Sequence, residues 1–133
     1  MTQEQWIEEE DSGFIAHVGP ILQTPTEPGQ GRFRFIAEDK HRNRAGYVQG
    51  GMLMTFADRA MGKTARQEDP DRAQATAQFD MQFLAPVEIG TTVDILCKVV
   101  KSTRHLVFMR GELFVENTCV ATAQGVWKII DRQ

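Results

Sequence analysis

The chain has 133 residues, a net charge of −3 at pH 7 and 25% charged residues. This length fits one domain with its own core and is too short for two. The acidic balance offers no basic surface for nucleic acid, and no apolar run approaches the ~20 residues that span a bilayer. The N-terminus lacks a signal-peptide pattern, and Cys97 and Cys119 lack CxxC spacing. We therefore expect a cytoplasmic protein with reduced core cysteines.

The polar residues narrow the possible chemistry. Neither Ser12 nor Ser102 lies in a GxSxG motif, and the three histidines show no metal-ligand spacing. The chain has no GxxxxGK[ST] loop and no GxGxxG motif. Serine-triad hydrolysis, zinc hydrolysis and nucleotide binding are thus disfavoured, and we expect no metal and no cofactor. Of the common types of catalysis, the one that remains uses a carboxylate side chain.

The first third of the chain predicts short elements. Residues 1–12 predict a short acidic helical extension, docked by Trp6 and Ile7, and residues 14–18 a first strand that ends at Gly19. A turn-rich segment over residues 24–30 leads into a second strand. There Phe33 and Phe35 alternate with arginines, the period-2 pattern of a half-buried strand.

A long helix is predicted from about residue 51 to residue 67. At roughly 100° per residue, its apolar side chains fall on one broad face. These are Leu53, Phe56, Ala57, Ala60, Met61 and Thr64. Arg59, Lys63 and Arg66 gather on the opposite side, and Asp58 lies on the flank between them.

The rest of the chain predicts strands. Residues 75–84 alternate strictly, with Thr76 on the polar face and Phe79 on the apolar face, and three further strands follow between turns. Consecutive long strands favour an antiparallel meander, so we expect one α+β domain over residues 1–133. A single sheet has edges that need cover, and so apolar a helix would bury more surface than one small sheet encloses. We therefore expect a homodimer, with association into a homotetramer (a dimer of dimers) as a further option.

The segment HRNRAGYVQGGMLMTFADRAMG, residues 41–62, carries the strongest functional signal. Gly50 and Gly51 open the predicted helix, where unpaired N–H groups and the helix dipole favour an anion. A glycine there lets a ligand approach the main chain closely. Asp58 follows two turns later on an otherwise apolar helix. An anion-stabilising corner and a lone acid are two halves of an acyl-transfer site.

This pattern resembles the hot-dog fold acyl-CoA thioesterases of the phenylacetate-degradation (PaaI-like) type. Their order of an asparagine, a short loop, a glycine pair and an acid on the central helix occurs here as Asn43, Gly50-Gly51 and Asp58. The later block TAQFDMQFLAPVEIG matches their following strand and turn. The resemblance covers roughly residues 30–130. It implies a curved antiparallel sheet wrapped around one long helix.

The resemblance also implies roles. Gly50 would offer its N–H to the thioester oxygen, and Asp58 would activate water or attack directly, facing the Gly50 of a partner subunit. Asn43 would orient the thioester, and Thr76 would hold the water near the acid. Such an enzyme hydrolyses an acyl-CoA to a free acid and CoA without a cofactor, because CoA belongs to the substrate.

Substrate contacts are predicted on the same basis. The family's usual histidine before the glycine pair is Gln49 here, which cannot carry a charge near neutral pH. Candidates for substrate binding are Gln49, Gly51, Met54, Met61, Phe79 and Arg104, with Met52 as a further lining residue and Arg59, Lys63 and Lys101 as further cations for CoA.

Other interpretations stay open. Asp58 could be a flank residue paired to an arginine, Asn43 could only cap its loop, and Thr76 could be an ordinary strand residue. His41 and the arginines beside it fit a solvated loop. Gln49 in place of histidine allows a non-catalytic acyl-CoA or fatty-acid binding protein on the same fold. A hot-dog dehydratase ranks last, because His41 lies at an unsuitable offset.

Overall fold

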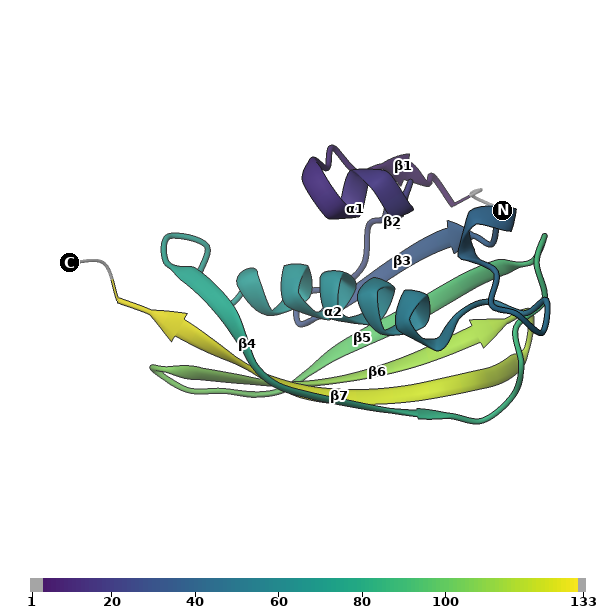
Figure 1. The fold of residues 1–133 in the computed structure, drawn as a ribbon. Helices are drawn as coiled ribbons and strands as arrows, with labels where there is room; N and C mark the ends of the chain where they lie inside the picture. Colours follow the sequence, from purple (N-terminus) through teal and green to yellow (C-terminus); the bar gives the residue numbers. More distant parts are fainter. Residues whose placement is uncertain (1–3, 132–133) are drawn as a thin grey trace.

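One antiparallel sheet and one long helix form most of the chain, and the computed structural model describes residues 4–131 (Figure 1). The helices are α1 (Gly13–Val18) and α2 (Gly50–Arg66), with a 3₁₀ turn, η1, at Asp39–His41. The strands are β1 (Ile7–Glu8), β2 (Leu22–Thr24), β3 (Gln30–Ile36), β4 (Ala73–Phe83), β5 (Thr92–Ser102), β6 (Leu106–Val115) and β7 (Thr118–Ile130). The long helix and the four long strands of the C-terminal half begin and end close to their predicted positions.

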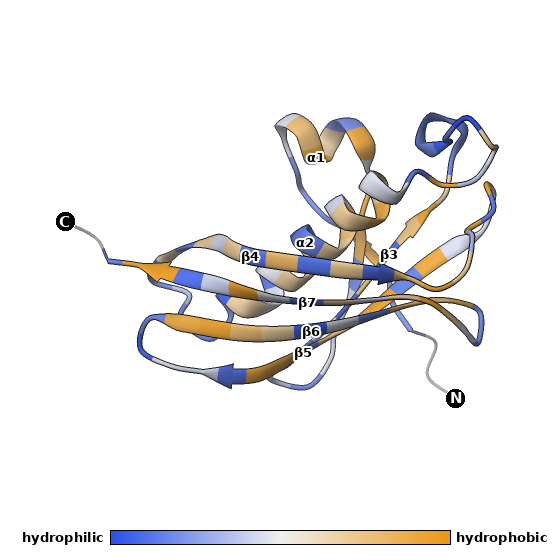
Figure 2. Ribbon diagram, turned by 60° about the horizontal axis from the view of Figure 1, so that its bottom comes forward, coloured by the Kyte–Doolittle hydropathy of each residue, from blue (hydrophilic) through white to orange (hydrophobic). Residues whose placement is uncertain are grey.

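The strands follow the order β1-β2-β3-β5-β6-β7-β4, and all neighbours are antiparallel. Strands β5, β6 and β7 form consecutive hairpins, as expected. The expected simple meander is wrong for β4, which pairs with β7 along its length and leaves its other side as a sheet edge. The segment after β4 instead carries the chain across to β5, which lies between β3 and β6. This order places β4 beside α2 at one side of the sheet (Figure 2).

The apolar face of α2 packs on the concave side of the sheet, and all six side chains predicted for that face are buried. Met61 lies directly over Gly111 of β6, where an added Cβ would stand 2.9 Å from the Met61 Sδ. The missing side chain therefore lets the helix approach the sheet closely. Each fully buried large apolar side chain contributes about 1.5–3 kcal/mol.

The two cysteines are free, as predicted. Cys97 of β5 is buried beneath α2, and this burial raises the pKa of its thiol to about 12 against a hydrogen bond from Thr64 that lowers it. Cys119 of β7 is half-buried. The Cys97 thiol is therefore not arranged as a nucleophile, because a reactive cysteine needs a lowered pKa.

The N-terminal expectations are wrong. Residues 1–3 lie outside the described part; residues 4–12 are extended rather than helical, and β1 pairs with β2. Residues 14–18, predicted as a strand, belong to α1. Ile15 and Val18 lie three positions apart and both pack against the core, which is helical rather than strand spacing. Trp6 does dock, beneath the Arg34 guanidinium, whereas Ile7 is exposed.

The architecture is the α+β hot-dog fold, with an open curved sheet rather than a closed barrel. Residues 4–24, which include the strands β1 and β2 at one edge of the sheet, form a strap that passes over the side of α2 opposite to the long strands β5, β6 and β7 (Figure 1). Within residues 4–131, no helix combines the length and the apolar character that crossing a membrane requires.

Candidate active site

The N-terminus of α2 presents free amide donors. The first intrahelical bonds run from Met52 and Leu53 to the Gln49 carbonyl, so the N–H groups of Gly50 and Gly51 have no acceptor within residues 4–131. The Gln49 side chain does not cap the helix, and the first turn carries no acid. The positive end of the α2 dipole is therefore not neutralised locally. An oxygen that gains negative charge would be stabilised there.

The loop before α2 is organised by Asn43. Its Oδ1 accepts hydrogen bonds from the N–H groups of Ala45 (2.9 Å) and Tyr47 (3.0 Å), and its own N–H donates to the Tyr47 carbonyl. Gly46 completes the turn at a φ of 91°, which favours glycine. The Nδ2 group of Asn43 makes no hydrogen bond within the described chain, so this residue both shapes the loop and keeps a donor available.

A cavity of about 360 Å³ joins Asn43 to Gly50. Its remaining walls are mostly apolar and come from the loop, α2 and the end of β4: Tyr47, Val48, Leu53, Phe83, Leu84, Ala85, Pro86 and Val87. The Phe83 ring stands 3.4–3.9 Å from the point that a Cβ on Gly50 would occupy. Gly50 thus borders a small, mostly apolar cavity that is open to solvent.

Asp58 and Thr76 meet on the flank of α2. The Thr76 hydroxyl donates a hydrogen bond of 2.8 Å to the Asp58 carboxylate, and both side chains remain open to solvent to some degree. No lysine or arginine within the described chain forms an ion pair with Asp58. The interpretation of Asp58 as a flank residue paired to an arginine is therefore not what the structure shows.

A β-bulge turns Thr76 toward Asp58. Thr76 pairs with Trp127 and Gln78 with Val126, so one extra residue, Ala77, interrupts the register. Trp127 is buried against α2, and its indole Nε1 lies 2.9 Å from a Cβ built on Gly62. The strict alternation predicted for residues 75–84 is therefore wrong at this point, and Thr76 lies on the helix face of β4. Bulges commonly re-aim a side chain in this way.

Gly50 and Asp58 are too far apart to act together within one chain. Eight residues separate them along α2, which corresponds to about 12 Å at 1.5 Å per residue. A general base and an oxyanion donor that act on one carbonyl must each lie about 3 Å from their atoms. A complete site would therefore need the Asp58 of another copy.

The remaining predicted substrate residues do not lie together. Gln49 and Gly51 line a separate cavity of about 440 Å³ between α1 and α2, together with Met52. Met54 lies on the Asp58 flank and is 37% exposed, whereas Met61 is fully buried. Phe79 is half-buried against Trp127, with ring centroids 6.5 Å apart. Arg104 belongs to the turn between β5 and β6. This turn lies at the sheet end remote from the start of α2 (Figure 1).

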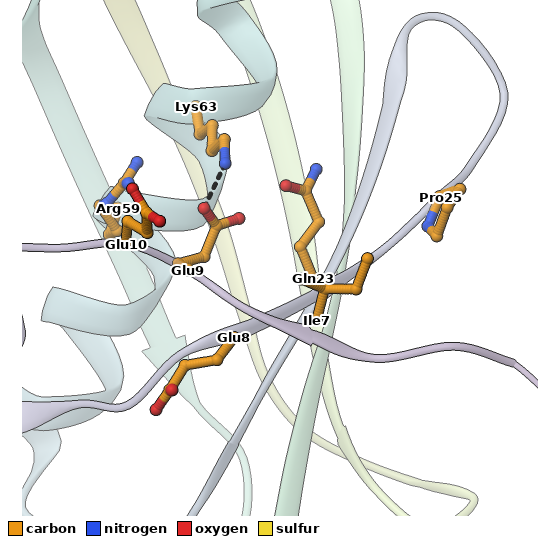
Figure 3. A pocket seen from close by; sticks show the side chains of 8 residues that line it. All are labelled: Ile7, Glu8, Glu9, Glu10, Gln23, Pro25, Arg59 and Lys63. Atoms are coloured by element: carbon orange, nitrogen blue, oxygen red, sulfur yellow. Dashed lines mark hydrogen bonds and ion pairs between the residues drawn. The ribbon is translucent and has the colours of Figure 1, made fainter.

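A larger cavity, about 670 Å³, lies on the other side of α2 between the strap and the helix (Figure 3). Its two cations, Arg59 and Lys63, were candidates for CoA phosphates. The structure pairs Lys63 with Glu9, and Arg59 with Asp11 at 2.8 Å. Since both cations are already neutralised and the cavity wall also holds Glu8 and Glu10, this space is poorly suited to an anion. The N-terminus of α2, with its free amide donors, is better suited to bind an anion.

Two features of the site were missed from the sequence. Phe83 and Leu84, at the end of the edge strand, line the same cavity as Gly50 and are 50% and 57% exposed. The alternation of apolar residues along the strand does not predict this position. His41, expected in a solvated loop, is 4% exposed. The proximity of His41 to Phe35, with ring centroids 5.2 Å apart, depends on tertiary folding.

Comparison with known proteins identifies the family. The family model of the thioesterase superfamily matches residues 45–121, more than half of the chain, and the chain belongs to this family. Human acyl-coenzyme A thioesterase 13 is 22% identical over 84% of this chain and 80% of its own length.

Solved structures share the fold. A mutant of phenylacetic acid degradation protein PaaI from Thermus thermophilus superposes with a TM-score of 0.81 at 20% identity, over 88% of this chain and 98% of that one. A Streptococcus mutans protein bound to acetyl CoA gives a TM-score of 0.76 at 20% identity, over 84% of this chain and 89% of that one.

Proposed function

We propose that this protein is an acyl-CoA thioesterase that acts as a homodimer. The observation that carries the proposal is the pairing of two features on α2: free glycine amides at its N-terminus and a carboxylate, Asp58, held by Thr76 and free of any ion pair in the described chain. Membership of the thioesterase superfamily and the name of the human relative support this choice of substrate.

The chemistry follows from these groups. Water attacks the thioester carbonyl carbon while the Asp58 carboxylate accepts one of its protons, and Thr76 holds the acid or the water in place. The Gly50 N–H binds the oxygen as it becomes negative. The tetrahedral intermediate then breaks its C–S bond, and the departing thiolate of CoA takes the proton that Asp58 accepted, which returns Asp58 to its carboxylate form. A free acid and CoA result. A positioned base contributes about 10²–10⁴-fold and an oxyanion donor about 10²–10³-fold.

A dimer through the β4 edge would complete the site. Strand β4 offers eleven residues of open edge, and Met54, Phe83 and Leu84 are exposed beside it. Long edge strands and apolar patches of this kind are usually covered in soluble proteins. A two-fold axis beside β4 would run the two α2 helices antiparallel, which brings Asp58 of each copy toward Gly50 of the other. We infer that the monomer is inactive.

The mostly apolar cavity between Asn43 and Gly50 would receive the acyl group, with Phe83 forming part of its wall. The CoA part would leave the site along the dimer interface, where the Nδ2 group of Asn43 is available to the thioester or the adjoining amide. Acetyl CoA in the S. mutans structure supports a ligand of this class.

The test is thiol release from a panel of short, medium and aryl acyl-CoAs by the wild-type protein and by Asp58→Asn. We expect turnover with at least one substrate and a loss of about 10²-fold or more in the variant. The asparagine keeps the shape of the side chain, so circular dichroism should be unchanged. Saturable acyl-CoA binding without thiol release from any substrate would instead favour the non-catalytic binding protein.

A further inference from the structure

His41 connects three parts of the molecule from a buried position. Its Nδ1 accepts a hydrogen bond of 2.9 Å from the Glu38 N–H. Because Nδ1 accepts, the ring proton of the neutral imidazole must lie on Nε2. That nitrogen is 2.6 Å from the carbonyl oxygen of Val18, to which it donates. Both ring nitrogens are thus bonded while the side chain is 4% exposed.

The Val18 carbonyl belongs to the end of α1. The last carbonyls of a helix have no intrahelical partner and need donors from elsewhere. Lys40 supplies a second donor here, since its Nζ lies 2.6 Å from the carbonyl oxygen of Gly19. Two neighbouring side chains of η1 therefore hold the end of α1, which belongs to the strap over residues 4–24.

The main chain of His41 continues to the candidate active site. Its carbonyl accepts the N–H of Gln49 at 2.8 Å, and Arg42 forms an isolated antiparallel bridge with Val48. Gln49 immediately precedes Gly50. The ring of His41 also meets Phe35 edge-on, and Phe35 contacts Phe56 of α2 with centroids 4.7 Å apart. His41 thereby connects the end of α1, β3 and, through Phe35, α2 with the residue that precedes Gly50.

We propose that His41 is a positioning residue for the Gly50 amide donor, and that it acts by tying the end of α1 to the loop before α2. This inference rests on the proposed thioesterase function. His41 itself does not touch the substrate. Its effect is geometric: a displacement of about 1 Å at a catalytic group can cost about 10²-fold in rate. The strap over residues 4–24 would then be required for turnover, although it lies outside the cavity between Asn43 and Gly50.

Two substitutions separate the two ring contacts. In His41→Asn, the amide can replace Nδ1 as the acceptor for Glu38 but does not reach Val18. In His41→Gln, the longer amide can place its N–H where Nε2 lies. Turnover is measured per binding-competent site, which is counted by calorimetric titration with a non-hydrolysable thioether analogue of the best substrate. His105→Asn, in the exposed turn between β5 and β6, is the matched control.

We expect His41→Asn to lower kcat per site by about 10-fold with analogue affinity nearly unchanged, and His41→Gln to recover at least half of the wild-type value. Amide hydrogen exchange should rise in residues 45–53 of His41→Asn and stay constant in β5 and β6. The control should match the wild type in both measurements.

Two results would overturn the inference. One is wild-type kcat per site in His41→Asn; the other is a loss of competent sites with unchanged kcat in those that remain, which would make His41 merely structural. If the wild-type protein hydrolyses no thioester, the proposed function fails separately. In that case, unchanged amide hydrogen exchange in residues 45–53 of His41→Asn would refute the proposal that His41 ties the end of α1 to the loop before α2. If His41→Asn does not fold, Lys40→Met tests the same connection from a more exposed position, and unchanged exchange there would refute it.

Discussion

The charged side chains on the two flanks of α2 have different kinds of partner. On the strap side, Arg59 and Lys63 are each bound by a carboxylate whose side chain is about nine-tenths buried, at 11% and 10% exposure. On the β4 side, Asp58 has a hydroxyl as its partner and stays open to solvent. On the first flank, each cation has a carboxylate partner within the chain. The second keeps an acid available, which is the requirement for a general base.

The sharpest test of this contrast exchanges an acid for an amide on each flank. Asp58→Asn should lower kcat by about 10²-fold or more while the free energy of unfolding changes little. Asp11→Asn should leave kcat within about 2-fold but reduce the free energy of unfolding by about 1–3 kcal/mol, because it weakens a partly buried ion pair. Thiol release and urea unfolding measure the two effects. Equal losses of activity in both variants would contradict the assignment of the flanks.

Removal of the Thr76 hydroxyl should have the next largest effect. Thr76→Val keeps the β-branched shape but cannot donate to Asp58, so we expect kcat to fall by about 10-fold. Thr76→Ser keeps the donor and should stay within about 3-fold of the wild type. Steady-state kinetics on the preferred substrate distinguish the two. A fully active valine variant would show that the 2.8 Å contact is not used in the reaction.

Shortening Phe83 should change selectivity more than rate. Phe83→Ala opens the space beside Gly50, and a single methylene of difference in an apolar pocket is worth about 1–3 kcal/mol. We expect the ratio of kcat/KM for a bulky over a small acyl-CoA to rise by about 10-fold. Leu84→Ala, at the neighbouring exposed position, serves for comparison. An unchanged ratio in Phe83→Ala would place the acyl group elsewhere.

The smallest expected effect is on the free energy of unfolding, and it comes from the ion pair between Glu9 of the strap and Lys63. Glu9→Gln weakens the contact with Lys63 and should lower the free energy of unfolding by about 1 kcal/mol, with kcat unchanged. Thermal unfolding and a parallel activity assay are sufficient. Increased stability after this change would mean that burial of the Glu9 charge, whose Oε1 has no hydrogen-bond partner in the described chain, costs more than its ion pair contributes.

Much of the fold could be predicted because its patterns are local and long. The α2 pattern repeats over seventeen residues, so its apolar face and the position of Asp58 on the flank are determined by helical periodicity. The glycine pair likewise marks the start of α2. In contrast, α1 has six residues, and so short an apolar segment has no decisive period. Both elements predicted for the strap, a helix before residue 13 and a strand over residues 14–18, were therefore wrong.

The sequence by itself determined which groups could supply the chemistry: two glycine amides, one acid on an apolar helix, and an asparagine in the loop before it. Tertiary structure decided which of these groups could meet. The bulge that turns Thr76 to Asp58 is a matter of register against Trp127, and the burial of His41 depends on α1 folding back over it. Both arise from contacts between residues distant in sequence, and periodicity along a single strand or loop carries no information about such contacts.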